Sequence, residues 1–275
     1  MNAVHKNIGF IGAGNMATAL ISGLIKAGYD CSRIYASSPE KDHLRKLEEE
    51  FSVNVTEYNK EVFLASSTIV LAVKPNVVIN VLEESSEIIS EKEDLIVSIV
   101  AGLEIKSIQA IIGLDKKIIR AMPNTPASLG MSASALTHNN LVDEKDKKEA
   151  EKIFSSVGIT CWLEEKFFDL YTALIGSGPA YIFYLIEALQ ESAQKIELSD
   201  NLIKNLIIQM IKGSASLAER SEDSPSKLRE RVTSPGGVTE RALEILNERK
   251  VKQHIVEAIL EGASRSKNLG KRENG

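Results

Sequence analysis

The sequence predicts an α/β protein with a doubly wound, mostly parallel sheet in its N-terminal part and an all-helical C-terminal domain. Short runs rich in Val and Ile alternate with helical stretches through the first half of the 275-residue chain, as is typical of parallel strands covered on both faces. A glycine-rich turn follows the first run, and beyond about residue 163 only helical patterns remain. We therefore expect two domains, 1–163 and 164–275.

The elements of the first domain are predicted to follow one another as strand and helix. Each strand is a short apolar run, and the helices carry apolar residues at helical spacing. Since crossovers between parallel strands are right-handed, these units should wind into a Rossmann-like sheet. The expected strands are 7–12, 33–37, 68–73, 94–100 and 116–122, with 132–138 and 159–163 extending the sheet, and the expected helices are 15–28, 76–90, 104–112 and 143–156.

The second domain should be helical throughout, with helix starts marked by Ser177, Ser199 and Ser224. Helix 179–196 is apolar on most faces in its first half, and such a helix must be covered on every side. We expect a second copy of the chain to supply part of that cover. The alternative is that this helix forms the core of a single-chain bundle.

Composition excludes several classes of protein. With 43% hydrophobic and 26% charged residues, the chain resembles a soluble globular protein, and its net charge of −5 gives no attraction to nucleic acid or anionic lipid. The glycine-rich turn comes too early for a signal peptide, and no apolar run approaches the roughly 18 residues of a membrane span. We expect a cytoplasmic protein without nucleic-acid or membrane partners, without a metal site, and with Cys31 and Cys161 as reduced thiols.

A dinucleotide site is predicted at the first glycine-rich turn. Gly12 and Gly14 begin a GxGxxA pattern that Ala17 completes. The first glycine allows a tight turn, the second lets a pyrophosphate approach the backbone, and the small third residue allows close helix–strand packing. The pattern could be a merely well-packed turn, but it follows a strand and opens a helix, which is the context that pyrophosphate binding requires.

The end of the second strand favours NADPH over NADH. An NAD site tends to carry an acid there that holds the ribose 2′-hydroxyl. This chain has Ser37 and Ser38 instead, and its first acid, Glu40, follows a proline. Hydroxyls with Lys41 and Arg45 nearby suit a 2′-phosphate. The Ser-Ser-Pro segment is also a good ordinary turn, so the use of NADH stays open.

Two further strand ends should line the cofactor crevice, because the carboxyl ends of parallel strands meet at one edge of the sheet. Val73 and Lys74 stand at one such end, although Lys74 could be a solvated loop charge. The segment 120–130 leaves another strand end and holds two prolines. These would stiffen a floor for the nicotinamide, whereas a plain connector would not need them.

A second anion site is predicted at the turn VTSPGGVT, residues 232–239. Gly236 and Gly237 leave backbone N–H groups unobstructed at a helix start, where the helix dipole favours an anion. Thr239 adds a hydroxyl in the first turn. The combination fits a small carboxylate with a hydrogen-bonding atom beside it, and a plain capped helix is the alternative.

In order and spacing, the segments GFIGAGNMA, ASSP, LAVKP, MPNTPA, GSGPAYIF and VTSPGGVT resemble those of pyrroline-5-carboxylate reductase, over residues 7–265. The resemblance implies an oxidoreductase that reduces the cyclic imine L-1-pyrroline-5-carboxylate to L-proline, the last step of proline biosynthesis, with NADPH or sometimes NADH. It also implies a two-domain subunit whose C-terminal helices interlock in a homodimer, often built up into a decamer.

The same resemblance implies roles for individual residues. Glu222 matches an acid that can face the ring nitrogen, from its own or the partner subunit. Arg231 departs from the family pattern, where Asn can stand, so we expect no cofactor contact from it. The positions carried over are Gly12, Gly14, Asn15 and Met16 at the pyrophosphate, Ser38 and Asn59 near the adenosine phosphate, Val73, Lys74 and Ala101 along the cofactor, and Gly237, Val238 and Thr239 at the substrate.

The chemistry explains why no histidine lies in a motif. An imine nitrogen is basic enough to arrive protonated, so the enzyme mainly has to place the imine carbon against the nicotinamide. We expect the helix-start N–H groups to hold the carboxylate while the Thr239 hydroxyl hydrogen-bonds to the ring nitrogen. The histidines outside this scheme are His5, His43, His138 and His254.

Two other functions stay open at the level of sequence. A hydroxyacid dehydrogenase of the same build would carry a catalytic Lys on the helix that begins the second domain, and neither Lys166 nor Lys195 lies in such a setting. A dinucleotide-sensing protein could keep the fold without turnover, although the intact SPGGVT turn argues against such a loss. Pyrroline-5-carboxylate-dependent oxidation of NADPH would distinguish the three functions.

Overall fold

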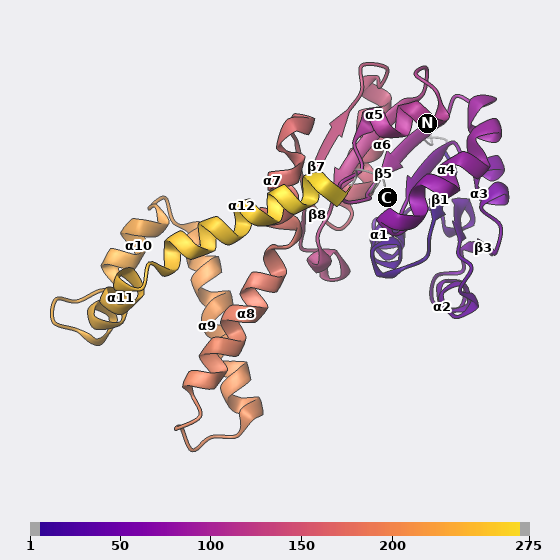
Figure 1. Cartoon of the computed structure of the whole chain (residues 1–275). Coiled ribbons are helices and arrows are strands. Elements are labelled where there is room, and N and C mark those ends of the chain that lie inside the picture. Colours follow the sequence, from indigo (N-terminus) through magenta and orange to yellow (C-terminus); the bar gives the residue numbers. More distant parts are fainter. Residues whose placement is uncertain (1–5, 270–275) are drawn as a thin grey trace. The chain divides into compact units, whose positions relative to one another are not determined.

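The computed structural model describes residues 6–269, so His5 lies outside the described residues. The chain forms two compact units (Figure 1). Unit 1 comprises the chain up to Ser177 together with the segment from Gly262 onward, and unit 2 comprises Gly178–Glu261. The chain therefore leaves unit 1 after Ser177, later than the predicted domain boundary at residue 163, and returns to it near its end.

Unit 1 is built on an eight-stranded sheet with the order β3-β2-β1-β4-β5-β6-β7-β8 (Figure 1). Neighbouring strands pair in parallel, except that β7 runs antiparallel to β6. The strands are Ile8–Ile11, Ile34–Ser37, Asn54–Thr56, Thr68–Leu71, Leu95–Ser98, Lys117–Met122, Ser132–His138 and Gly158–Trp162. The predicted doubly wound, mostly parallel sheet is confirmed.

Helices cover both faces of this sheet because alternate strand residues point to opposite sides. Phe10 of β1 packs in one core with α1, α2 and α6. The next residue, Ile11, packs in the other core with α3, α4 and α5. These helices are α1 Asn15–Lys26, α2 Lys41–Phe51, α3 Asn59–Ala65, α4 Pro75–Ser90, α5 Ile105–Ile112 and α6 Glu144–Ser155.

The segment between β2 and β4 carries three elements that the sequence pattern did not predict: α2, β3 and α3. Helix α2 buries only Leu44 and Leu47, so its apolar stripe is thin. Strand β3 has three residues and α3 has seven, and both are too short for a periodic signal. These elements matter for the site because α3 begins with Asn59.

Beyond β8 the described chain is helical, as predicted for the residues after 163. Ser199 and Ser224 act as helix N-caps, accepting hydrogen bonds from the N–H groups of Leu202 and Lys227, and Ser177 lies just before α8. The elements that follow the sheet are η3 Glu165–Phe167, α7 Phe168–Tyr171, the π-helical turn η4 Thr172–Gly176, α8 Gly178–Ser192, α9 Asp200–Arg220, α10 Pro225–Arg231, α11 Val238–Glu248 and α12 Val251–Leu269.

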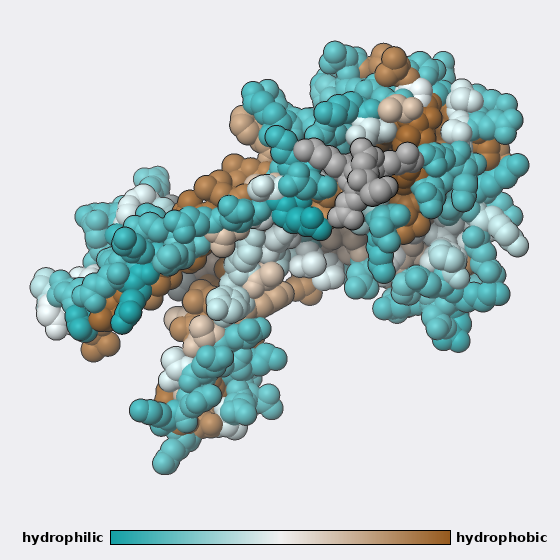
Figure 2. All heavy atoms as spheres, in the orientation of Figure 1, coloured by the Kyte–Doolittle hydropathy of each residue, from teal (hydrophilic) through white to brown (hydrophobic). Residues whose placement is uncertain are grey.

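Helix α8 has no buried residue. The single-chain bundle core, the alternative for this helix, is therefore wrong: within one chain its apolar side chains stay in solvent, with Phe183 exposed to 60% and Tyr184 to 75%. Figure 2 shows hydrophobic residues exposed along the helices of unit 2. Exposed apolar side chains that lie together along several helices are typical of a protein–protein interface.

The helical stretch Glu165–Ser192 is long and apolar enough to cross a membrane by length and composition alone, with 11% of its apolar window buried. No segment of this kind was expected, because no uninterrupted apolar run in the sequence is long enough to span a membrane. Mean hydropathy over a window tolerates the polar residues that interrupt such a run. One such helix is weak evidence for a membrane span, since an uncovered interface helix has the same composition.

Candidate active site

The turn between β1 and α1 is held tightly to the neighbouring strands. Gly12 has a φ of +100°, and its N–H donates to the main-chain oxygen of Ser37 at 2.9 Å. A Cβ added to Gly12 would lie 2.6 Å from the main-chain oxygen of Ala72. Both the backbone conformation and the close approach therefore require glycine here.

The start of α1 fits a pyrophosphate. Gly14 is the N-cap residue and supplies no side-chain cap, and a Cβ added to it would meet no atom within 4 Å. Within the described chain the N–H groups of Asn15, Met16 and Ala17 donate to no acceptor; the first bond of the helix runs from Thr18 to Gly14. Open space in front of unpartnered N–H groups at a helix start is what an anion needs.

The end of β2 brings together residues from distant parts of the chain. The buried hydroxyl of Ser37 donates to Oδ1 of Asn59 at 2.7 Å. Ser38 is also buried, and its hydroxyl accepts from the N–H of Glu40 at 3.1 Å. No carboxylate lies among these contacts. The two serines and Asn59 thus form one polar cluster at the carboxyl edge of the sheet.

The cations expected beside this cluster are paired with acids of their own. Lys41 lies 3.0 Å from a carboxylate oxygen of Glu57, and Arg45 lies 3.5 Å from that of Asp42. These pairs are exposed and contribute little. The cations therefore stay available to a phosphate that arrives at the strand end.

The ends of β4 and β5 complete this edge. Val73 lies next to the glycine turn, since a Cβ on Gly12 would be 3.1 Å from its Cγ1. Lys74 is exposed and is the N-cap residue of α4, followed by a proline at the first helical position. Ala101 is half-buried in the loop after β5, the strand beside β4. The cofactor positions named from the sequence, Asn59 after β3 included, thus follow the ends of five neighbouring strands, β3-β2-β1-β4-β5.

The loop after β6 is fixed by Asn124, a residue not predicted from the sequence. Its Oδ1 accepts from the hydroxyl of Ser132 and the N–H of Ala133, both at 3.1 Å, and its Nδ2 donates to the main-chain oxygen of Ile175 at 3.1 Å. This buried amide ties the loop to β7 and to η4. Its place between the two prolines of MPNTPA was the available signal.

The second predicted site, in unit 2, is a type II turn that opens α11. The N–H of Gly237 donates to the main-chain oxygen of Ser234 at 2.9 Å, Pro235 occupies the second position, and Gly236 has a φ of +70° at the third. A Cβ on Gly237 would lie 2.8 Å from the oxygen of Ser234. The turn therefore requires both glycines, for different reasons.

The amides that this turn offers differ from those that the sequence suggested. The N–H of Gly236 donates to Oε2 of Glu240 at 2.6 Å, and that of Gly237 closes the turn. In the described chain, the N–H groups of Val238, Thr239 and Glu240 have no acceptor, and the next bond runs from Arg241 to Gly237. The first turn of α11 thus presents three amides and the exposed Thr239 side chain.

Glu222 lies exposed in the loop between α9 and α10, in the same unit as the turn. Its neighbour Asp223 forms an ion pair with Arg231, the residue that departs from the family pattern. Arg231 thus has an ion-pair partner within the loop that carries Glu222. The predicted cofactor residues, from Gly12 to Ala101, lie in unit 1, and the predicted substrate residues lie in unit 2.

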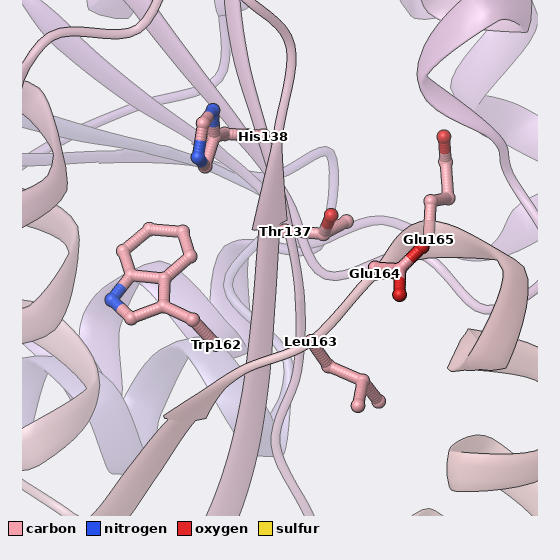
Figure 3. Close-up of a pocket in the computed structure, with 6 residues that line it drawn as sticks. All are labelled: Thr137, His138, Trp162, Leu163, Glu164 and Glu165. Carbon is pink, nitrogen blue, oxygen red and sulfur yellow. The ribbon is translucent and has the colours of Figure 1, made fainter.

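A pocket in unit 1 is lined by none of the predicted cofactor residues of that unit (Figure 3). Figure 3 shows His138 and Trp162 with their rings in contact, and the centroids are 5.4 Å apart in an edge-on arrangement. His138 pairs with Ile119 in the amino-terminal half of β6, away from the carboxyl edge that carries the glycine turn. Among the described residues no group of three His, Cys, Asp or Glu side chains could hold a metal ion.

Comparison with known proteins identifies the family. A family model described as pyrroline-5-carboxylate reductase dimerisation matches residues 165–269, and one described as NADP oxidoreductase coenzyme F420-dependent matches residues 7–102. The pyrroline-5-carboxylate reductase of Pseudomonas aeruginosa is 38% identical over 95% of this chain and 96% of its own. Pyrroline-5-carboxylate reductase 2 of Bacillus subtilis is 35% identical over 96% of this chain and 95% of its own.

Solved structures agree. The pyrroline-5-carboxylate reductase of Coxiella burnetii is 39% identical with a TM-score of 0.88, covering 97% of this chain and 99% of its own. The Plasmodium falciparum pyrroline carboxylate reductase, solved with NADP bound, is 32% identical with a TM-score of 0.89 and the same coverage. The chain therefore belongs to the pyrroline-5-carboxylate reductase family.

Proposed function

We propose that NADPH binds at the β1–α1 turn of unit 1 and that L-1-pyrroline-5-carboxylate binds at the turn 234–239 of unit 2. The chain is an NAD(P)H-dependent oxidoreductase that reduces this cyclic imine to L-proline, the last step of proline biosynthesis. The observation that carries the function is the identity of 34–38% with named reductases over nearly the whole chain. It favours this activity over a hydroxyacid dehydrogenase or a dinucleotide sensor.

The cofactor residues divide by the part of NADPH that they would hold. The unpartnered N–H groups of Asn15 and Met16 would bind the pyrophosphate, and the bare Gly14 would let it approach them. Serines at the strand end, without a carboxylate, support a 2′-phosphate over a bare hydroxyl. When bound, the cofactor supplies the hydride. The remaining positions in this proposal are Gly12, Ser37, Ser38, Asn59, Val73, Lys74 and Ala101.

The substrate residues act on the two polar groups of the imine acid. The N–H groups of Val238 and Thr239 would hold the carboxylate, where the helix dipole adds to the attraction. The diglycine, Gly236 and Gly237, gives the turn its shape and keeps this end of the helix bare. The Thr239 hydroxyl would hydrogen-bond to the ring nitrogen, and Glu222 would face that nitrogen and favour its protonated form.

The chain forms homo-oligomers, in keeping with the dimerisation model matched to 165–269. We propose that the exposed side chains of α8 and α9 meet those of a second copy in a homodimer, and that dimers build up into a decamer. The proposal also divides the roles along the chain, with nucleotide binding in 1–163 and substrate binding and dimerisation in 164–275, although the compact units themselves divide at Ser177 and Gly262. It further includes a cytoplasmic location without nucleic-acid or membrane partners, because an interface would bury the apolar helix that a membrane would otherwise cover.

Oxidation of NADPH in the presence of pyrroline-5-carboxylate tests the function, and the variant Thr239→Ala tests the site. Loss of one transition-state hydrogen bond should lower kcat about 10- to 100-fold. Thr239→Ser keeps the hydroxyl and should retain most of the activity. Because Thr239 is exposed, the thermal stability of both variants should match the wild type. Wild-type turnover by Thr239→Ala would remove Thr239 from the mechanism.

A further inference from the structure

We propose that Glu240 is a positioning residue, which orders the turn 234–237 so that the start of α11 can bind the substrate carboxylate. This inference rests on the proposed function of that turn. Glu240 is the third residue of α11, and its carboxylate reaches back to the N–H of Gly236 at 2.6 Å. The side chain thus closes over the substrate turn from within its own helix.

The contact differs from an ordinary capping box. In that motif the acid at the third helical position binds the N–H of the N-cap residue, which here is Gly237. Glu240 instead binds the N–H one residue earlier, and the N–H of Gly237 goes to Ser234. The acid therefore holds the turn itself rather than the helix end.

The peptide that Glu240 holds is the one that can flip. Types I and II of a four-residue turn differ mainly in the orientation of the peptide between the second and third residues, here Pro235 and Gly236. Type II needs the positive φ that Gly236 shows. A Cβ on Gly236 would meet no atom within 4 Å, so no neighbouring group packs against that side of Gly236. The peptide is held by the hydrogen bond from its N–H to Glu240.

The held orientation decides which amides face the substrate. With Gly236 and Gly237 both engaged, the amides of Val238, Thr239 and Glu240 alone point outward at the helix start. A flipped peptide would turn the carbonyl of Pro235 to where the N–H of Gly236 now lies. That carbonyl would then oppose a carboxylate beside it.

Glu240 is itself an anion close to the proposed position of the substrate carboxylate. The alternative role is therefore that Glu240 repels this carboxylate from the start of α11. The turn is exposed to solvent, where repulsion between like charges is screened. A hydrogen bond from an amide to a charged acceptor is among the stronger kinds. We therefore expect ordering of the turn to outweigh repulsion, and the direction of the change in KM separates the two roles.

The test compares variants of the full chain by steady-state kinetics with pyrroline-5-carboxylate and NADPH. Glu240→Ala should raise KM for the substrate about 5- to 10-fold, with kcat and KM for NADPH within about twofold of the wild type. Glu240→Gln keeps an acceptor at the same reach and should restore KM. Glu240→Asp keeps the charge but is too short, so it should behave like Glu240→Ala.

The matched control is Glu244→Ala, which removes an exposed carboxylate from the same helix, paired with Arg241 at 2.9 Å, and should leave KM unchanged. A KM that falls or stays unchanged in both Glu240→Ala and Glu240→Asp would overturn the positioning role. So would a Gln variant as impaired as the Ala variant. An inactive wild type would instead refute the proposed function, and a fully active Thr239→Ala would place the substrate elsewhere.

Discussion

Replacing Gly14 by Ala should weaken NADPH binding without disturbing the fold. Gly14 has φ −74° and ψ −176°, a backbone conformation that any residue adopts. Its added Cβ would touch no protein atom within 4 Å, and so it would stand in the space proposed for the pyrophosphate. Alanine is a poorer N-cap than glycine by about 1 kcal/mol, and the lower entropy of the unfolded alanine chain offsets part of that at this φ and ψ, so the unfolding free energy should fall by about 0.5 kcal/mol.

Gly12→Ala should do the opposite and damage the fold first. The φ of +100° disfavours an L-residue, by roughly 1–2 kcal/mol. The contact at 2.6 Å is with the main-chain oxygen of Ala72, which cannot rotate away, and overpacking of this kind costs a further ~1–3 kcal/mol. The sum, about 2–5 kcal/mol, corresponds to a fall in Tm of roughly 5–15 °C.

Two measurements test this pair. Thermal unfolding without cofactor should separate Gly12→Ala from the wild type and leave Gly14→Ala close to it. Titration of NADPH by its fluorescence should give Gly14→Ala a Kd raised at least about tenfold, equal to ~1.4 kcal/mol. If Gly14→Ala folds normally and binds NADPH as tightly as the wild type, the pyrophosphate does not lie at this helix start.

Two predictions concern stability. The buried ammonium of Lys116 donates to two main-chain oxygens at the end of α4, at 2.9 and 3.0 Å, so Lys116→Met should cost about 2 kcal/mol in urea unfolding; an unchanged midpoint would contradict this. The N–H of Asp146 and then the ammonium of Lys117 hold the pKa of Asp143 at about 2, below its usual 3.8. That group therefore stabilises the fold above pH 4 and stops doing so as the pH falls towards 2. The urea midpoint should thus fall less between pH 5 and pH 2.5 in Asp143→Asn than in the wild type. An equal fall in both proteins would contradict this.

The sequence was most informative where burial forces a pattern. The central strands are apolar on both faces, so their runs stand out, and each was predicted within a residue or two of its bounds. The direction of β7 was not predictable, because side-chain alternation is the same in parallel and antiparallel strands. Helix α2 was not predicted, because Leu44 and Leu47 are its only buried residues and give too weak a periodic pattern.

The glycine-rich turns before α1 and α11 indicated from the sequence where ligands could bind. The sequence did not show which backbone N–H groups are free to bind them. The pattern SPGG gives the turn type, yet the partner of Gly236 lies four residues on, at Glu240. An acid three residues after an N-cap is a known signal, and it was available here. The bond from Ser37 to Asn59 could not be foreseen, because it joins two elements whose approach depends on the fold.

The path of the chain between the two units limits how the protein can be shortened. Unit 2 begins after Ser177 and ends before Gly262, where α12 rejoins unit 1, and the buried Ser266 hydroxyl bonds to Asp169 at 2.8 Å. Unit 2 is thus an insertion within the sequence of unit 1, and it does not follow unit 1 at its C-terminal end. A premature stop codon within α12 would remove the segment from Gly262 onward, which belongs to unit 1. A single C-terminal truncation therefore cannot yield unit 1 with all of its residues.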